Sequence, residues 1–167
     1  MDVETLFIDS SNIELLEQIA LLRIMENSEL EGVETEKLKQ VSQKRLDNIT
    51  NNVLIPMMDE EADGTNFILA HDRYKGEFLG YIQGRVDMFD TLLYRSTGLF
   101  VSQEHRKKGV GKKLKESQHI FAKNKGYKGI ITTTTKKNEH AIRLLKSLGY
   151  QLDNALWKNG LEATLIF

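Results

Sequence analysis

The chain has 167 residues, a formal net charge of −1 at pH 7 and no cysteine. This length suits a single domain with a self-supporting core, and the lack of cysteine excludes disulfides, thiolate metal sites and a cysteine nucleophile. The N-terminal residues are acidic rather than basic, and no apolar run is long enough to span a bilayer. We therefore expect a cytoplasmic protein with no membrane partner.

The first third of the chain predicts one short strand followed by two helices. Residues 3–8 have the composition of a strand, and residues 10–12 are good caps for a helix that continues to about Asn27. A second helix is expected over residues 35–51, ending before Pro56.

The rest of the chain predicts strands that alternate with helices. One helix is expected from about Gly111, and another is opened by Asn138 and closed by Gly149. The runs rich in strand-forming residues are 67–72, 77–86, 92–102, 129–135, 151–157 and 161–167. This order of elements predicts one α/β domain in which helices cover a mixed sheet.

The near-neutral total charge hides an asymmetry between two parts of the chain. Residues 1–63 contain 15 acidic and 5 basic residues, whereas residues 64–167 contain 9 acidic and 18 basic residues. Surfaces of opposite charge attract different ligands, so the two parts are predicted to bind different partners. Solvation alone is the alternative explanation of these charges.

The loop before the Gly111 helix carries much of the positive charge. In the stretch SQEHRKKGVGKKLKES, residues 102–117, six Lys or Arg residues surround two glycines. Free backbone N–H groups and the helix dipole favour an anion at a helix start, and glycine lets the backbone approach it closely. We therefore predict a pyrophosphate site, with a solvated basic surface as the alternative.

Two common phosphate-binding loops do not match this stretch. A Walker loop would need glycine at Arg106 and a hydroxyl side chain at Lys113. A dinucleotide-binding loop that starts at Gly109 would need glycine or alanine at Leu114. Both types are excluded by residue identity.

Two sequence patterns remain, and together they point to one family. The first, R-x-x-G-x-G after an apolar strand end, comprises Leu99, Phe100 and Val101, then Arg106, Lys107, Lys108, Gly109, Val110 and Gly111. The second, N-x-x-A followed by L-G-aromatic, comprises Asn138, Ala141, Leu148, Gly149 and Tyr150. These patterns and their spacing resemble the GNAT superfamily of N-acetyltransferases over roughly residues 64–157.

The resemblance implies a single GNAT-like domain over residues 1–167, with a mostly antiparallel twisted sheet of six to seven strands and about four helices. It implies acetyl-CoA as cofactor, bound by residues 64–167, and an acceptor side formed by residues 1–63. The cofactor-binding residues that it implies are Leu99, Phe100, Val101, Arg106, Lys107, Lys108, Gly109, Val110, Gly111, Lys112 and Asn138. Asn138 has a second explanation, because asparagine is also a good helix cap.

The implied reaction transfers an acetyl group to a primary amine of a small molecule or a protein. Residues 26–36 contain five glutamates, which would attract a cationic acceptor, although a solvated acidic surface is equally compatible with them. The family also implies a homodimer. Nucleic acid is not expected, because stacking aromatics do not alternate with the lysines, and the four histidines lack the spacing of metal ligands.

The residues that would transfer protons in this reaction are the hardest to predict from the sequence. Many family members have a tyrosine that protonates the departing thiolate four residues before the glycine of L-G-aromatic, but this chain has Leu145 there. The candidate catalytic residues are Tyr94 as the acid and Asp90, with its neighbour Asp87, as the base. Water is the alternative to Tyr94 as the proton source. If neither replaces the tyrosine, a non-catalytic acyl-CoA-binding or sensor domain is the alternative function.

Overall fold

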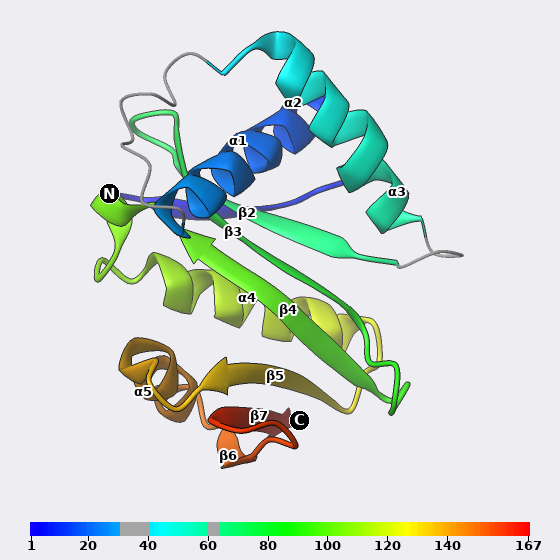
Figure 1. Ribbon diagram of the computed structural model, residues 1–167, viewed down its shortest axis with the longest axis vertical. Helices are drawn as coiled ribbons and strands as arrows, with labels where there is room; N and C mark the ends of the chain where they lie inside the picture. Colours follow the sequence, from blue (N-terminus) through cyan, green and yellow to red (C-terminus); the bar gives the residue numbers. More distant parts are fainter. Residues whose placement is uncertain (31–40, 60–63) are drawn as a thin grey trace.

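A single sheet with helices on both faces forms the molecule (Figure 1). The structure is a computed structural model, which describes residues 1–30, 41–59 and 64–167. The strands in this described part are β1 (Val3–Phe7), β2 (Asn66–Asp72), β3 (Glu77–Val86), β4 (Leu93–Val101), β5 (Gly129–Thr135), β6 (Gln151–Asn154) and β7 (Gly160–Ile166). The helices are α1 (Ile13–Leu30), α2 (Gln43–Ile49), α3 (Ile55–Met58), α4 (Val110–Asn124) and α5 (Glu139–Ser147).

The seven strands lie in the order β1-β2-β3-β4-β5-β7-β6. Every neighbouring pair is antiparallel except β4 and β5, which run parallel. The prediction of a mixed, mostly antiparallel sheet in a single domain is therefore confirmed.

The parallel pairing of β4 with β5 is short, and this opens the sheet. It begins with Leu93 opposite Gly129 and ends with Ser96 opposite Thr132, although both strands continue beyond these residues. The two arrows start close together and separate toward their arrowheads (Figure 1). A fork therefore forms between β4 and β5, with one edge of β4 left open.

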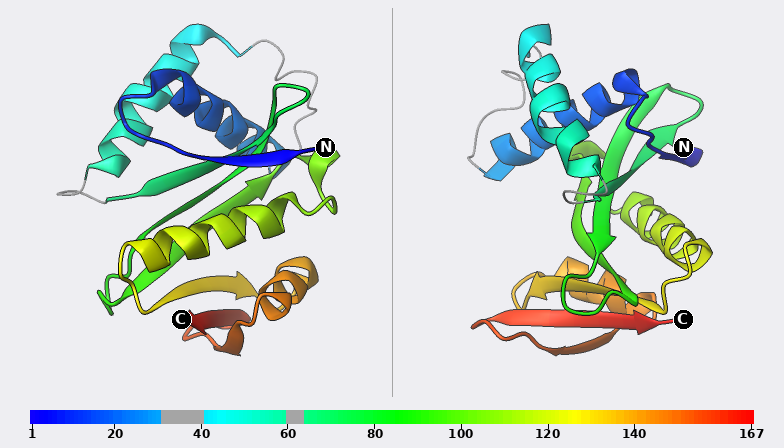
Figure 2. Two further views of the ribbon diagram at one scale, coloured as in Figure 1. Left: turned by 180° about the vertical axis from the view of Figure 1, so that it is seen from behind. Right: turned by 90° about the vertical axis from the view of Figure 1, so that its right-hand side faces the viewer.

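The two faces of the sheet are covered by different helices (Figure 2). On one face, α1 and the helices that follow it pack on Phe67, Tyr81 and Phe100. On the other face, α4 packs on β2, β3 and β4, and α5 packs beside it against β5. Alternate side chains of each strand supply these two cores, as the period of a β-strand requires.

A β-bulge in β4 changes which side chains face α4. Gln83 of β3 pairs with Gly98, and the next residue, Gly84, pairs with Ser96, so Thr97 is the extra residue on β4. As a result Ser96 and Leu99 both point to the α4 face, although they are three residues apart. The bulge lies at the fork between β4 and β5.

Local sequence signals located most elements but misplaced the end of the second helix. The strand predicted over residues 129–135 is β5, and Asn138 caps α5 by accepting a hydrogen bond from the Ala141 N–H at 3.1 Å. The helix expected to end before Pro56 instead continues through a π-helical turn, Thr50–Leu54, into α3. Pro56 is tolerated because it lies in the first turn of α3. The predicted start of this helix, residues 35–40, lies outside the described residues.

Candidate active site

A continuous groove begins at the α4 start and ends at the fork between β4 and β5. Its wide part has a volume of about 700 Å³, and its narrow end has a volume of about 180 Å³. The two parts share the side chains of Leu99, Asn138, Ala141 and Leu144. The wide part alone has the size of a cofactor site.

The wide part contains the start of α4. The first hydrogen bond of this helix runs from the Lys113 N–H to the Gly109 carbonyl at 3.0 Å, and no side chain of the described residues caps the helix. The preceding N–H groups of the first turn therefore have no acceptor within the helix. Gly109, with φ of +86°, and Lys107, with φ of +60°, turn the loop so that it enters the helix here. The arrangement favours an anion such as a pyrophosphate.

Gly111 forms part of the groove floor. A Cβ atom on this residue would lie 3.7 Å from a Leu99 methyl and 3.8 Å from methyls of Leu144 and Val101. These are ordinary van der Waals contacts, and all three neighbours line the groove. A methyl group therefore fits at this position, whereas a larger side chain would project into the groove.

Most of the predicted cofactor-binding residues come together in the wide part. Those that line it are Leu99, Val101, Arg106, Lys107, Gly109, Val110, Gly111, Lys112 and Asn138. Phe100 does not, because its side chain is 5 % exposed and packs on the opposite face beneath α1. Lys108 is exposed in the loop and does not line the groove. Asn138 lines the groove and caps α5, so its two interpretations are compatible.

The Arg106 side chain connects the basic loop to two other elements. Its Nε donates to the Val101 carbonyl at 2.9 Å, and its guanidinium forms an ion pair with Glu29 of α1. The guanidinium also lies 5.8 Å from the centre of the Phe100 ring. Arg106 therefore holds the loop against β4 and α1, and its side chain is already engaged by the protein.

The narrow end contains a buried lysine that the sequence analysis missed. Lys115 of α4 is 3 % exposed, and its Nζ donates to Ser96 Oγ at 2.8 Å. The Thr132 hydroxyl donates to the Ser96 carbonyl at 3.0 Å and closes the same end of the fork. Burial lowers the pKa of Lys115 to about 7. Leu145 also lines this end, and it cannot donate a proton.

A helical pattern could have revealed Lys115. In the sequence it was counted only as one of the six basic residues around the two glycines. However, it lies four residues after Gly111, three before Gln118 and seven before Ala122, which is the spacing of one helix face. That face is buried, so this lysine differs from the other basic residues nearby.

Tyr94 and Asp90 do not line either part of the groove. The Tyr94 ring is 1 % exposed and packs against Phe121 and Tyr127, with centroid distances of 5.6 and 5.4 Å. Burial raises the pKa of its hydroxyl above the usual value. The positions of these two residues therefore do not support the proton-transfer roles expected from the sequence.

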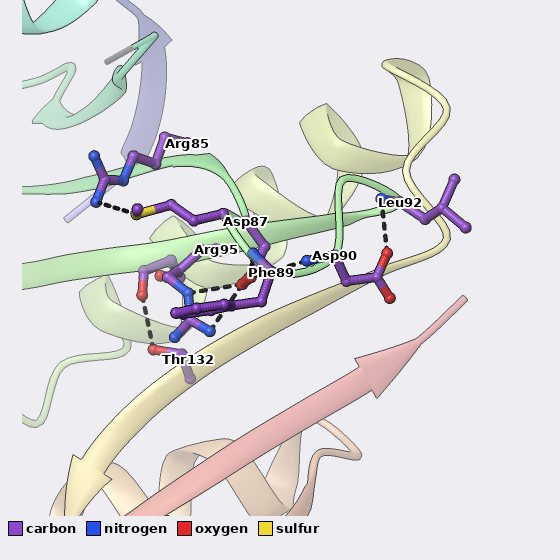
Figure 3. A network of polar contacts seen from close by, with 9 residues as sticks. Arg85, Asp87, Phe89, Asp90, Leu92, Arg95 and Thr132 are labelled. Atoms are coloured by element: carbon purple, nitrogen blue, oxygen red, sulfur yellow. Dashed lines mark hydrogen bonds and ion pairs between the residues drawn. The ribbon is translucent and has the colours of Figure 1, made fainter. Parts of the chain in front are cut away.

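The acidic residues of the β3–β4 turn stabilise that turn (Figure 3). The Asp90 carboxylate accepts from the Leu92 N–H at 3.0 Å and points away from Arg95 and Thr132. Asp87 forms an ion pair with Arg95 at 2.8 Å and accepts from the Phe89 N–H. Burial opposes its ionisation, but the Phe89 N–H and the Arg95 guanidinium hold the pKa of Asp87 below its usual value.

The opposite face of β4 has a separate set of polar groups supplied by α1 and β3. Glu26 accepts a hydrogen bond from the Tyr81 hydroxyl at 2.5 Å, and Arg23 donates to the Gln83 side chain at 3.0 Å. Burial, together with Glu26, raises the pKa of Tyr81. Three of the five glutamates predicted to attract a cation, at positions 31, 34 and 36, lie outside the described residues.

Residues 1–30, 41–59 and 64–167 contain neither a candidate metal site nor a candidate membrane-spanning helix. Within these ranges, no group of three or more His, Asp or Glu side chains has the arrangement of a metal site. None of the helices in the same ranges is long and apolar enough to cross a membrane.

Comparison with known proteins places the groove in a family context. The model of the acetyltransferase (GNAT) family matches residues 25–150, which include the basic loop, the fork and α5. No curated protein sequence matches the chain.

Solved structures match the fold over nearly the whole chain at low sequence identity. The PaiA N-acetyltransferase of Thermoplasma acidophilum, solved in complex with coenzyme A, is 13% identical with a TM-score of 0.65, and the match covers 100% of both chains. The ribosomal-protein-S5-alanine acetyltransferase of Vibrio fischeri is 14% identical with a TM-score of 0.73, over 99% of this chain and 93% of that one. A GNAT-family acetyltransferase of Staphylococcus aureus is 18% identical with a TM-score of 0.61, over 99% of each.

Proposed function

This chain belongs to the acetyltransferase (GNAT) family, and we propose that its groove holds acetyl-CoA and presents the thioester to a cationic primary amine. As a member of this family, the chain is an acetyl-CoA-dependent N-acetyltransferase. The observation that carries the proposal is the groove itself, which joins the free N–H groups at the start of α4 to the fork between β4 and β5.

We assign the phosphates of the cofactor to the wide part of the groove and its thioester to the narrow end. The free N–H groups at the start of α4, from Val110 to Lys112, bind the pyrophosphate. The exposed lysines 107, 108 and 112 lie nearby and bind the 3′-phosphate. The pantetheine arm then follows the apolar side chains of Leu99 and Leu144 toward the narrow end, where the thioester lies.

The open edge of β4 is assigned to the pantetheine and the oxyanion. Because β5 leaves β4 after Ser96, residues 99–101 have an edge to which the pantetheine amides can pair like an added strand. The Ser102 N–H donates to Leu79 of β3, so the alternation of the strand directs the Phe100 N–H to β3 and the Val101 N–H to the open edge. The Val101 N–H then stabilises the oxyanion that forms when the amine attacks. The Thr97 bulge supports this role, since bulges occur where a strand is adapted to a site.

The acceptor is assigned to the side of β4 that faces α1. The Glu26 carboxylate lies on this side, and the Tyr81 hydroxyl holds it in position. Glu29 contributes less to the negative field, because Arg106 already neutralises it. A cationic amine is attracted by the charge of residues 1–63, which is strongly negative.

Competition between two acceptors tests this assignment. Thiol release from acetyl-CoA is measured with a polyamine, spermidine, and with an anionic amine, taurine, at low and high salt. The polyamine is expected to react faster at low salt, and Glu26→Gln is expected to reduce its advantage, which salt also weakens. Indifference to acceptor charge at both salt concentrations would contradict the cationic assignment.

The proposal extends to assembly and location. A homodimer is supported by the edge strand β6 and by Leu156 and Trp157, which are exposed in the turn before β7. Sedimentation of the wild-type chain and of Leu156→Asp tests the homodimer, with a shift to monomer expected in the variant.

Use of acetyl-CoA, which cells make and keep inside, supports a cytoplasmic location.

A further inference from the structure

Acetyl transfer needs a proton source at the narrow end of the groove. When the C–S bond of the thioester breaks, the sulfur leaves as a thiolate, which must gain a proton to become the product thiol. Leu145 occupies the position from which a family tyrosine would supply that proton, and its side chain has no hydrogen to donate.

Lys115 is the only ionisable side chain among the described residues that line this end. Its Nζ is fixed by Ser96 Oγ at 2.8 Å, and an ammonium group has further N–H donors beyond the one that Ser96 accepts. Ser96 in turn is held by the fork, because the Thr132 hydroxyl donates to its carbonyl. A charged donor is therefore positioned where the sequence lacks the expected phenol.

The groups that surround Lys115 leave its charge uncompensated. No carboxylate in the described part of the chain pairs with it. Ser96 of β4 and Thr132 of β5 are uncharged, and the Tyr150 ring lies 5.7 Å from Nζ. His119 of α4 bonds to the Tyr150 hydroxyl at 2.8 Å. Burial and the charge of Lys115 lower the pKa of His119 to about 4, and burial raises that of Tyr150, so both are neutral near pH 7.

We propose that the ammonium group of Lys115, held in place by Ser96, donates the proton that converts the departing CoA thiolate into the free thiol. This role rests on the proposed function, because it requires acetyl-CoA in the groove with its sulfur at the narrow end. Lys115 is then the proton donor of the reaction, and Ser96 is a positioning residue.

The protons and electrons of the step balance. The acceptor nitrogen attacks the carbonyl carbon with its lone pair and forms the new C–N bond, while the C–S bond breaks and leaves its electron pair on sulfur. Lys115 gives a proton to this sulfur and becomes a neutral amine. The acceptor nitrogen releases one proton to water, and Lys115 regains one from water.

Burial makes this lysine a suitable acid. An ordinary lysine, with a pKa of about 10.4, is a weaker acid than a thiol with a pKa of about 8.5. The pKa of Lys115 is lowered to about 7, so transfer of its proton to the thiolate is favourable. Burial among uncharged side chains produces this property.

The test compares the wild-type chain with Lys115→Met, which keeps an unbranched side chain, one atom shorter, and removes its charge. At saturating acetyl-CoA and acceptor, thiol release near neutral pH is expected to fall at least about tenfold. The wild-type rate should decline on the alkaline side as Lys115 loses its proton, and this decline should be absent from the variant. Binding of acetyl-CoA, measured by calorimetry, should stay within about threefold of wild type.

A second measurement needs no acceptor. Lys115 and the sulfur of bound CoA titrate as a coupled pair when they are in contact, so the pH at which the thiolate absorbance appears should differ between the wild-type complex and the Lys115→Met complex. Lys123→Met is the matched control, because Lys123 lies further along α4 and is exposed. It should behave as wild type in both measurements.

Equal rates and equal pH profiles in wild type and Lys115→Met would overturn the proposal. A rate loss without a shift of the thiolate titration would also overturn it, since that combination indicates a purely structural role. Failure of the proposed function is recognised separately, because the wild-type chain would then bind no CoA at all, and the role of Lys115 would fail with it.

Discussion

The two ends of the groove use lysine in opposite ways. At the wide end, Lys107 and Lys112 line the groove and are exposed. At the narrow end, Lys115 is 3 % exposed and its pKa is lowered to about 7. Exposed lysines attract an anion through a field that salt screens. The buried lysine can change its charge near neutral pH, which suits proton transfer.

The difference comes from position on one helix rather than from residue type. Lys112 and Lys115 are three residues apart in α4, yet one faces solvent at the groove mouth and the other faces the fork. A sequence run that looks uniformly basic therefore contains two kinds of functional group. The variants below separate these two kinds.

Lys115→Met should have the largest effect, and that effect is on stability. Lys115 has a pKa of about 7 in the folded chain and an ordinary value of about 10.4 in the unfolded chain. Below pH 7 the wild-type fold therefore carries the full cost of a buried ammonium, on the order of 4 kcal/mol, which the variant lacks.

The same argument fixes the sign of the pH dependence. Between the two pKa values the unfolded chain binds more protons, so the free energy of unfolding of wild type rises with pH through this window. The advantage of Lys115→Met should therefore be greatest at about pH 6 and vanish above about pH 10. Urea denaturation at several pH values measures it, and a variant less stable than wild type at about pH 6 would show that Lys115 is not destabilising.

Gly111→Val should prevent cofactor binding at the wide end of the groove. The branched side chain would project into the groove beyond the methyl contacts that a Cβ makes with Leu99, Val101 and Leu144. Acetyl-CoA affinity is expected to fall at least about a hundredfold, while the fold remains intact by circular dichroism. Gly111→Ala, whose single methyl fits, is the matched control and should lose much less. Unchanged binding by the valine variant would show that the cofactor lies elsewhere.

Tyr94→Phe should have the smallest effect. The ring contacts with Phe121 and Tyr127 are retained, and the lost hydroxyl interacts with Gln118 and Asn66 rather than with the groove. Thiol release is expected to change by less than about threefold, and stability to fall by about 1 kcal/mol. A loss on the order of a hundredfold in rate would instead make Tyr94 the acid and contradict the role given to Lys115.

Local signals in the sequence were enough to predict the core of the fold and the phosphate end of the site. The β-branched run of β5, the Asn138 cap and the glycines of the basic loop each specify a backbone conformation from a few neighbouring residues. Each of these patterns acts over one helical turn or one strand, so it can be interpreted from the sequence without knowledge of tertiary contacts.

The narrow end could not be predicted in the same way, because it depends on contacts between distant segments. Ser96 meets Lys115 only through the packing of α4 on β4. Leu99 faces the same groove only because Thr97 forms a bulge. Tyr94 was chosen as the acid for its chemistry and its place on β4, yet the same strand directs its ring into the core. The start of α3 at Ile55, just before Pro56, likewise depends on a π-helical turn that composition does not reveal.

Calorimetric titration with acetyl-CoA tests the central claim most directly. We predict binding that weakens as salt rises, because the free N–H groups and exposed lysines at the start of α4 hold the phosphates electrostatically. CoA that lacks the 3′-phosphate should bind more weakly, and its affinity should respond less to salt. No heat of binding at any salt concentration would contradict the assignment of the groove to acetyl-CoA.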